Sequence, residues 1–565
     1  MSALRFPRAA GGWLGLALLL YLGLRLAALA QAEVLEDRDS ASLIRDAQGF
    51  ATWDLAGIVA LRPDATPLQP LGTALLGELG PPLPTAARAL AFLSALLLLG
   101  ALVALAWMIA REASPVDRPA LAAGTVLAAA LSPTLVELSR AVLTEGPYVA
   151  LVTLGLSMLL WPGDRWSTRR AAALGLVFGL AFLARTEGLV YIAVLPGLMV
   201  VQALWGRRLA PAAADSGRPG WRRLPRWFLA YGACFALLAL PQVWRVSHVM
   251  GQPAINGRQV WQVILNQPDE QPYERRIYGL DHSPSVINLF YIQSHPQLAR
   301  QMATRMVASD VLGKALENLW RFFLEVLPRL LGPLGLLLAI LGLPLLWRLA
   351  RGDALLALGF GAASLAAPLA HDLDPRHLAV SLPLLALCQG AGWAWLLALV
   401  RGNGADPGPG GPDRRRLVGA VLALLLALGL SAGLRADLTQ ALRPDPAEQD
   451  YSWADQEQLL AALAAAGWPA PAPELRLVAR QGFLSLDAGG QEVHLPFTDY
   501  PGLLRYCRLH QAQVLFLEHA MLKKYPFLAR FQAGDTPEFR RFFRYQSPSH
   551  GLMELYHIAP GTGEP

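Results

Sequence analysis

Ionisable residues stand in a few short polar segments of an otherwise apolar chain. The first segment, VLEDRDSASLIRDAQGF (residues 34–50), directly follows a long apolar run and carries several carboxylates. A carboxylate within reach of a hydroxyl can act as a general base, and arginine can bind phosphate through two parallel hydrogen bonds. The residues that could do such chemistry are Glu36, Asp37 and Asp39; Arg140 and Glu145; Arg185 and Glu187; and Asp374, Arg376 and His377.

The composition excludes an ordinary soluble protein. Of 565 residues, 54% are hydrophobic and only 16% are charged, so most of the chain must lie in a membrane. All but three of the 48 basic residues are arginine, as is typical of proteins from high-GC bacteria. Three scattered cysteines, Cys234, Cys388 and Cys507, are too few for a disulfide framework or a cysteine metal site.

Apolar runs of about 20 residues are long enough to cross a bilayer as helices, and the chain has about eleven of them. The first lacks a small-residue cleavage site followed by soluble sequence, so we interpret it as a retained helix. The predicted spans are residues 11–31, 86–110, 119–138, 144–161, 171–185, 187–205, 227–244, 325–348, 354–370, 377–400 and 417–434.

The arginine-rich connections predict the orientation. Basic residues gather in the cytoplasmic loops of membrane proteins, and here they gather in alternate connections. These connections are RFPR, REASPVDR, GDRWSTRR, residues 205–226, WRLARGD and residues 401–416. We therefore expect a cytoplasmic amino terminus and an external carboxyl terminus, with residues 34–50 on the outer face.

The chain is expected to form two domains. Residues 1–434 would form the multi-span domain, with external loops at about 32–85 and 245–324. In residues 435–565, ELRLVAR, QEVHLPF, QVLFLEHA and GLMELYHIA predict short strands, and two amphipathic segments predict helices. The fold class is therefore a mainly α, polytopic membrane protein with a small C-terminal extracytoplasmic α/β domain.

This topology places the polar segments on the outer side, in four different connections. Ionisable groups at span ends are costly unless they are paired or wetted, so we expect a shared polar cavity there. Plainer interpretations stay open, since acids favour helix amino termini. They are Glu36 and Asp37 as solvated residues before a helix that starts near Ser40, Asp39 as its N-cap, Thr144 and Glu145 as caps of the span at 144–161, and Arg185 with Glu187 as a structural ion pair.

The segment HDLDPRH (371–377) also raises the possibility of a metal site, because two histidines stand beside two acids. The spacing matches no known metal motif. We therefore assign no metal site and no certain cofactor, and leave a divalent cation open.

Several motifs together resemble a known family. LEDRDSASLIRDA after the first span, ATPLQPLGTALLGELG, SRAVLTEGPYVAL, GLAFLARTEGLVYIAVLP and DPRHLAVSLPLLAL are similar to the C-type membrane glycosyltransferases. They resemble most the bacterial branch related to protein O-mannosyltransferases and lipid A aminoarabinose transferases. The order of the motifs covers roughly residues 10–400, and a terminal periplasmic α/β domain is common in that group.

The resemblance implies transfer of a sugar from a polyprenyl phosphate to a lipid, glycan or protein acceptor outside the cytoplasm. It places the catalytic carboxylate at Asp39, although Ser40 stands where the family often has an acid, and Asp37 and Glu36 compete for the role. The phosphate leaving group needs a cation more than an acid, and Arg376, with Arg185 second, would supply it. Supporting polar residues would be Arg140, Glu145, Glu187, Asp374 and His377.

We therefore expect an inverting glycosyltransferase in the bacterial cytoplasmic membrane, with membrane lipids and no nucleic acid among its partners. The external loop at 245–324 would supply aromatic and amide groups for a lid. A transporter or flippase for lipid-linked sugars is the first alternative, but it would place ionisable residues near the bilayer middle. A non-catalytic envelope scaffold and a polysaccharide polymerase or ligase are the others.

Overall fold

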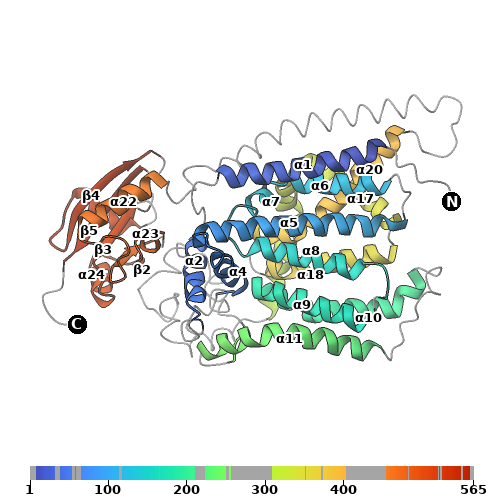
Figure 1. Cartoon of the computed structure of the whole chain (residues 1–565), viewed down its shortest axis with the longest axis horizontal. Helices are drawn as coiled ribbons and strands as arrows, with labels where there is room; N and C mark the ends of the chain where they lie inside the picture. Colours follow the sequence, from blue (N-terminus) through green and yellow to red (C-terminus); the bar gives the residue numbers. More distant parts are fainter. Residues whose placement is uncertain are drawn as a thin grey trace. The chain divides into compact units, whose positions relative to one another are not determined.

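The computed structural model shows a bundle of long helices and a separate small sheet (Figure 1). It describes residues 8–31, 38–53, 58, 65–112, 117–164, 166–209, 223–249, 253–255, 308–349, 351–370, 373, 375–401, 453–480, 483–518, 521, 525–548 and 551–559.

The bundle is built in chain order from helices joined by short connections. The first half contains α1 (Arg8–Gln31), α4 (Leu68–Gly77), α5 (Leu83–Ile109), η1 (Ala110–Glu112), α6 (Asp117–Ala130), α7 (Pro133–Glu137), α8 (Glu145–Leu160), α9 (Thr168–Ala184), η2 (Thr186–Val190), α10 (Tyr191–Leu209) and α11 (Leu224–Val249). The second half contains α16 (Ala308–Arg321), the π-helix η4 (Phe322–Val326), α17 (Leu327–Leu349), α18 (Arg351–Ala370), α19 (Pro375–Leu378), η5 (Ala379–Ser381) and α20 (Leu382–Arg401).

The polytopic, mainly α fold is confirmed. Within the described residues, five helices are long and apolar enough to cross a membrane: Gly12–Ala30, Leu83–Ile109, Leu224–Val249, Gly313–Arg348 and Arg376–Leu397. The expected spans from 11–31 to 377–400 all overlap described helices, whereas 417–434 lies outside the described residues. Leucines on the outer side of α11, such as Leu229 and Leu237, are exposed, as suits a surface that meets lipid tails.

Two expected segments differ from the structure. The span at 119–138 is broken at Leu131 and Ser132 into α6 and α7, because Pro133 can only begin a new helix there. The loop at 245–324 is shorter than expected. Its first residues continue α11, and its last residues form the amphipathic helix α16, whose mixed polar and apolar faces gave no long apolar run.

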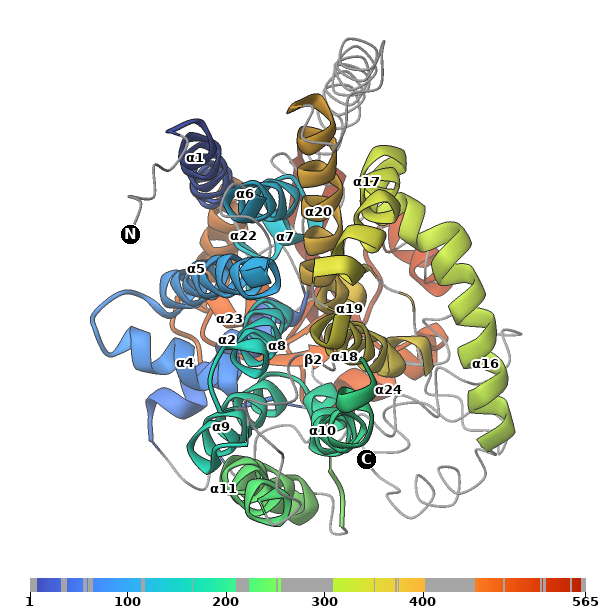
Figure 2. The ribbon, with the colours of Figure 1, turned by 90° about the vertical axis from the view of Figure 1, so that its right-hand side faces the viewer.

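Small residues let the central helices approach closely. Seen along the helix axes, α6 lies beside α20, and α20 lies beside α17 (Figure 2). A Cβ atom added at Gly124 of α6 would lie 2.9 Å from the Cα atom of Gly390 on α20. An added Cβ at Gly392 would likewise meet the backbone of Leu338 on α17. Close backbone contact of this kind is the usual basis of helix packing in membranes.

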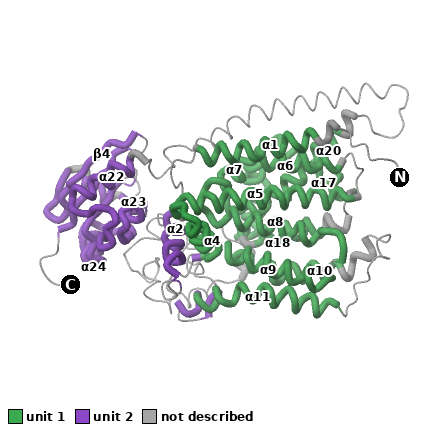
Figure 3. Tube along the Cα trace, viewed as in Figure 1, with its two compact units in different colours: residues 1–31, 66–245, 308–443 green, residues 32–65, 246–307, 444–565 purple. Residues whose placement is uncertain are grey.

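The chain divides into two compact units (Figure 3). Unit 1 contains Met1–Gln31, Thr66–Arg245 and Ala308–Arg443, and unit 2 contains Ala32–Ala65, Val246–Val307 and Pro444–Pro565. The helix α2 (Arg38–Ala51), which follows the first span, therefore belongs to the same unit as the C-terminal sheet.

The C-terminal part forms an α/β domain, as expected. Its five-stranded sheet has the order β2-β1-β3-β5-β4, with β1 parallel to β2 and β3, and with β5 antiparallel to β3 and β4. The strands are β1 (Arg476–Ala479), β2 (Gln491–His494), β3 (Val514–Glu518), β4 (Phe539–Ser547) and β5 (Gly551–Ile558). The helices are α22 (Trp453–Ala465), α23 (Phe483–Asp487), α24 (Tyr500–Leu509) and η6 (Pro526–Ala533).

Strand β4 was not predicted from the sequence. Its pairing with β5 shifts between Arg541 and Phe543, so the extra residue Phe542 interrupts the alternation of side chains. A strand is recognised in a sequence chiefly by unbroken alternation, and the bulge removes that signal.

Candidate functional site

A cluster of buried charged side chains lies where α9 ends and α8 begins, in unit 1. Arg185 Nη1 donates to Glu145 Oε1, and Arg185 Nη2 donates to Glu187 Oε1 at 2.7 Å. The side chains of Arg185 and Glu145 are only 4% and 6% exposed, so this ion pair is shielded from water. The structure thus brings together two of the sequence motifs, SRAVLTEGP and FLARTEGL.

Local backbone geometry explains why Arg185 can reach both carboxylates. Arg185 itself is extended (φ −150°, ψ 138°), which ends α9, and the chain then turns into the 3₁₀ helix η2. Gly188 packs so tightly on α9 that an added Cβ atom would lie 2.5 Å from the backbone nitrogen of Phe182. Only glycine fits at position 188 in this turn, and the turn brings the Glu187 carboxylate back to the Arg185 guanidinium group.

A third connection contributes positive charge to the same cluster. Arg376 and His377, in the short helix α19, both interact electrostatically with Glu145. Two arginines thus face two carboxylates, and His377 would make the cluster net positive when it is protonated. Arg185 is held by both carboxylates, and the choice of Arg376 as the phosphate ligand stays a prediction.

Thr144 stands at the N-cap position of α8, and Glu145 is in the first turn, as the plainer interpretation expected. The Thr144 side chain makes no capping hydrogen bond to α8, and its hydroxyl instead lies 3.3 Å from Glu145 Oε2. Arg140 is buried in the turn after α7.

Buried tyrosines extend the polar cluster into the bundle, and the sequence interpretation missed them. Tyr148 stands one helical turn after Glu145 and contacts Tyr191 through its hydroxyl. The Tyr191 hydroxyl lies 2.6 Å from Ser364 Oγ on α18. Tyr231 on α11 donates to the Tyr191 carbonyl oxygen at 2.8 Å. The i, i+3 spacing of Glu145 and Tyr148 was the signal that could have identified this chain of hydroxyl groups.

A buried arginine in the first span was also missed, and its role is structural. Arg25 on α1 donates from both terminal nitrogens to the carbonyl oxygens of Ala129 and Ala130, each at 2.8 Å, and lies 3.8 Å from the ring centre of Tyr21. It therefore caps the carboxyl end of α6, where the broken span leaves backbone carbonyls without helical partners.

The predicted carboxylates of the first loop are only partly described. Asp39 lies in the first turn of α2, which begins at Arg38, so it does not stand before the helix as an N-cap residue would. Glu36, Asp37 and Asp374 lie outside the described residues. The catalytic role of these acids stays a prediction.

The segment HDLDPRH, which raised the possibility of a metal site, is only partly described. Among the described residues, no three histidine, cysteine or acidic side chains lie together in a way that could hold a metal ion. His371, Asp372 and Asp374 of the candidate segment fall outside that part of the chain.

Several solved structures resemble this chain over nearly its whole length. ArnT from Cupriavidus metallidurans in the apo state is 16% identical, with a TM-score of 0.54, and the match covers 99% of this chain and 100% of that one. The same protein bound to undecaprenyl phosphate is 17% identical, with a TM-score of 0.53, covering 98% and 99% of the two chains.

The oligosaccharyltransferase from Archaeoglobus fulgidus is similar as well. Its apo form is 13% identical, with a TM-score of 0.57, and the match covers 99% of this chain and 75% of that one. The fold resemblance inferred from the sequence motifs is therefore confirmed. No protein-family profile matches the chain, and no curated protein matches it in sequence.

Proposed function

We propose that this chain, which has the fold of the C-type membrane glycosyltransferases, moves a sugar from a polyprenyl-phosphate donor to an acceptor hydroxyl. Two similar proteins support a lipid-phosphate donor, since ArnT was solved with undecaprenyl phosphate and the archaeal oligosaccharyltransferase with a dolichol-phosphate and an inhibitory peptide. The observation that carries the proposal is the buried ion pair of Arg185 and Glu145, with the half-buried Glu187 beside it and with Arg376 and His377 acting on Glu145.

Arg376 is the proposed ligand of the donor phosphate. The sugar–phosphate bond breaks with its electron pair on the phosphate oxygen, so charge grows on that oxygen in the transition state. A fixed guanidinium group stabilises such charge without reorganising. Arg185, held by Glu145 and Glu187, would set the position of the helix ends around Arg376 and bind phosphate only as the second choice.

Asp39 is the proposed general base, with Asp37 and Glu36 as alternatives. The acceptor oxygen attacks the anomeric carbon from the face opposite the phosphate, its proton passes to the carboxylate, and polyprenyl phosphate leaves. The product is a glycoside of inverted configuration.

The proposed setting is the bacterial cytoplasmic membrane, with the site on its outer face. Consecutive helices of unit 1 run side by side in alternating directions (Figure 1). The arginine-rich connections that follow α8 and α10 therefore lie at the end opposite the one that carries Glu145 and Arg185. By the positive-inside rule, the arginine-rich end faces the cytoplasm.

The test is transfer of labelled sugar from a panel of polyprenyl-phosphate donors by membranes with matched protein levels. We expect Arg376→Ala and Asp39→Asn each to lower kcat by about 100-fold or more. The matched controls are Arg348→Ala and Asp164→Asn, whose side chains are exposed at the arginine-rich end, and they should retain wild-type rates.

Other outcomes would redirect the proposal. An active Asp39→Asn with an inactive Asp37→Asn or Glu36→Gln would keep the reaction and move the base. Absence of transfer from every donor, even with native envelope extract as acceptor, would contradict the proposal and favour the transporter or scaffold function.

A further inference from the structure

The first external helix and the C-terminal domain are joined by one arginine. Arg45 of α2 donates from Nη1 to Glu492 Oε2 at 2.7 Å and from Nη2 to Ser485 Oγ at 2.9 Å. The paired residues are 447 positions apart in the sequence, yet α2 and the domain belong to the same compact unit. Each terminal nitrogen of the guanidinium group thus has its own acceptor in the domain.

The acceptors on the domain side are held in defined positions. Glu492 lies on β2, the edge strand of the sheet, and Ser485 lies in α23, the short helix between β1 and β2. His494 Nδ1 lies 3.3 Å from the other carboxylate oxygen of Glu492. Burial raises the pKa of Glu492, but the hydrogen bond from His494 and the charge of Arg45 outweigh it and lower the pKa, so the carboxylate is ionised at neutral pH.

The helix α2 links Arg45 to Asp39, because both residues stand on it. Its 14 residues bury an apolar face that includes Ala41, Ile44 and Ala47, while Arg45 projects beside that face and remains 35% exposed. Asp39 stands in the first turn of the same helix. A helix moves as a rigid body over this length, so the domain that holds Arg45 also restricts the place of Asp39.

We infer that the C-terminal domain is a positioning element for the transfer reaction, acting through Arg45, Glu492 and Ser485 on the helix that presents Asp39. The inference rests on the proposed function, and it assigns a role to a domain that carries no proposed catalytic group. Arg45 is a positioning residue in this scheme, since it acts through α2 and touches no reacting atom.

A charge exchange tests this role. Arg45→Glu and Glu492→Arg alone place like charges together, whereas the double variant restores an opposite pair at the same place. We expect each single variant to speed hydrogen exchange of the α2 amides by about tenfold and to lower kcat by a similar factor with little change in KM. The double variant should recover most of both losses.

The chain offers a matched control. Arg541 and Glu554 also pair at 2.7 Å, with similar exposures of 28% and 11%, but they lie on β4 and β5, away from the β2 edge of the sheet. Arg541→Glu should leave α2 exchange and kcat unchanged. Ser485→Ala, which removes one hydrogen bond and keeps the ion pair, should give a smaller effect than Arg45→Glu.

The exchange measurement needs no donor, so it separates this inference from the proposed function. Unchanged α2 exchange in Arg45→Glu and Glu492→Arg, or an equal response to Arg541→Glu, would overturn the inference. Responsive α2 exchange in a chain that transfers no sugar would support the coupling and contradict the proposed function instead.

Discussion

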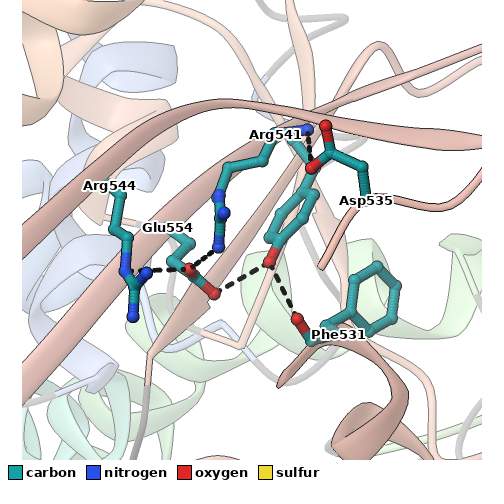
Figure 4. A network of polar contacts seen from close by, with 6 residues as sticks. Phe531, Asp535, Arg541, Arg544 and Glu554 are labelled. Carbon is teal, nitrogen blue, oxygen red and sulfur yellow. Dashed lines mark hydrogen bonds and ion pairs between the residues drawn. The ribbon is translucent and has the colours of Figure 1, made fainter. Parts of the chain in front are cut away.

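The ion cluster at the end of α9 and the ion cluster on β4 and β5 contain the same groups in opposite proportions. In the first, one arginine, Arg185, is shared by two carboxylates. In the second, one carboxylate, Glu554, is shared by Arg541 and Arg544, and Tyr556 donates to it as well (Figure 4).

The exposure of the side chains explains how each ion cluster accommodates its excess charge. The excess charge in the domain cluster lies on Arg544, whose side chain is 59% exposed, so water solvates it. The cluster at α9 is less open to water, because Arg185 and Glu145 are almost fully buried and Glu187 is 24% exposed, and α19 adds positive charge. A buried cluster that needs a charge from another connection is suited to function, whereas a solvated one is suited to ordinary surface structure.

The largest expected effect comes from Arg185→Met. It leaves Glu145 buried without its main counter-charge, which costs about 3–5 kcal/mol of stability. We expect a sharply lower thermal midpoint of the detergent-solubilised protein and loss of transfer. Adding Glu145→Gln to this variant should recover part of the stability, and a further fall would contradict the assignment of the cost to an unpaired charge.

Arg25→Met should cost less, although Arg25 is equally buried. Its partners are two backbone carbonyls and a tyrosine ring, so removing it leaves no buried charge. The expected loss is about 1–3 kcal/mol for two orphaned carbonyl groups. The same thermal measurement checks it, and a loss as large as that of Arg185→Met would show that burial alone, and not charge pairing, sets the cost.

Arg541→Met should have a small effect in the domain cluster. Arg544 remains beside Glu554 and water reaches the site, so we expect about 0–1 kcal/mol. Added salt should weaken the wild-type pair and reduce the difference between the two proteins. A loss of several kcal/mol would indicate that the β4–β5 cluster is as critical as the cluster at α9.

The last prediction depends on pH and concerns a single carboxyl group in α23. Burial raises the pKa of Asp487 from its ordinary 3.8 to about 7. Between these values the folded state holds a proton that the unfolded state has lost, so the free energy of unfolding falls as pH rises through this window. Asp487→Asn should remove this fall, which for a pKa raised by about three units amounts to about 4 kcal/mol at pH 8, less the cost of burying the amide. Thermal midpoints at pH 5 and pH 8 test this, and parallel pH profiles would contradict it.

The sequence was most informative where a pattern is local. Apolar runs identified the long helices of unit 1, since helix formation and bilayer crossing both depend on contiguous residues. They missed the amphipathic helix α16. The same reasoning recognised β1, β2, β3 and β5 by their alternation or apolar runs, and it failed at β4, where the bulge at Phe542 breaks the period.

The candidate site was predicted in part. Glu145, Arg185, Glu187, Arg376 and His377 were chosen because they fall at span ends on one side, and the structure places them together. Tyr148 and Tyr191 were missed because a tyrosine in an apolar helix is usually a packing residue, and only the i, i+3 spacing from Glu145 distinguishes Tyr148. The acids of residues 36–39 and Asp374 stay predictions.

What the sequence alone determined was the mainly helical, polytopic fold and the small C-terminal α/β domain, because each follows from residues close together in the chain. Tertiary structure alone decided which partners those charges meet. Arg185 is shared by two carboxylates, Arg25 caps α6 across 105 positions, and Arg45 joins α2 to Glu492. Such pairings depend on how distant helices and strands pack, and their energetic consequence depends on the degree of burial, which no local pattern records.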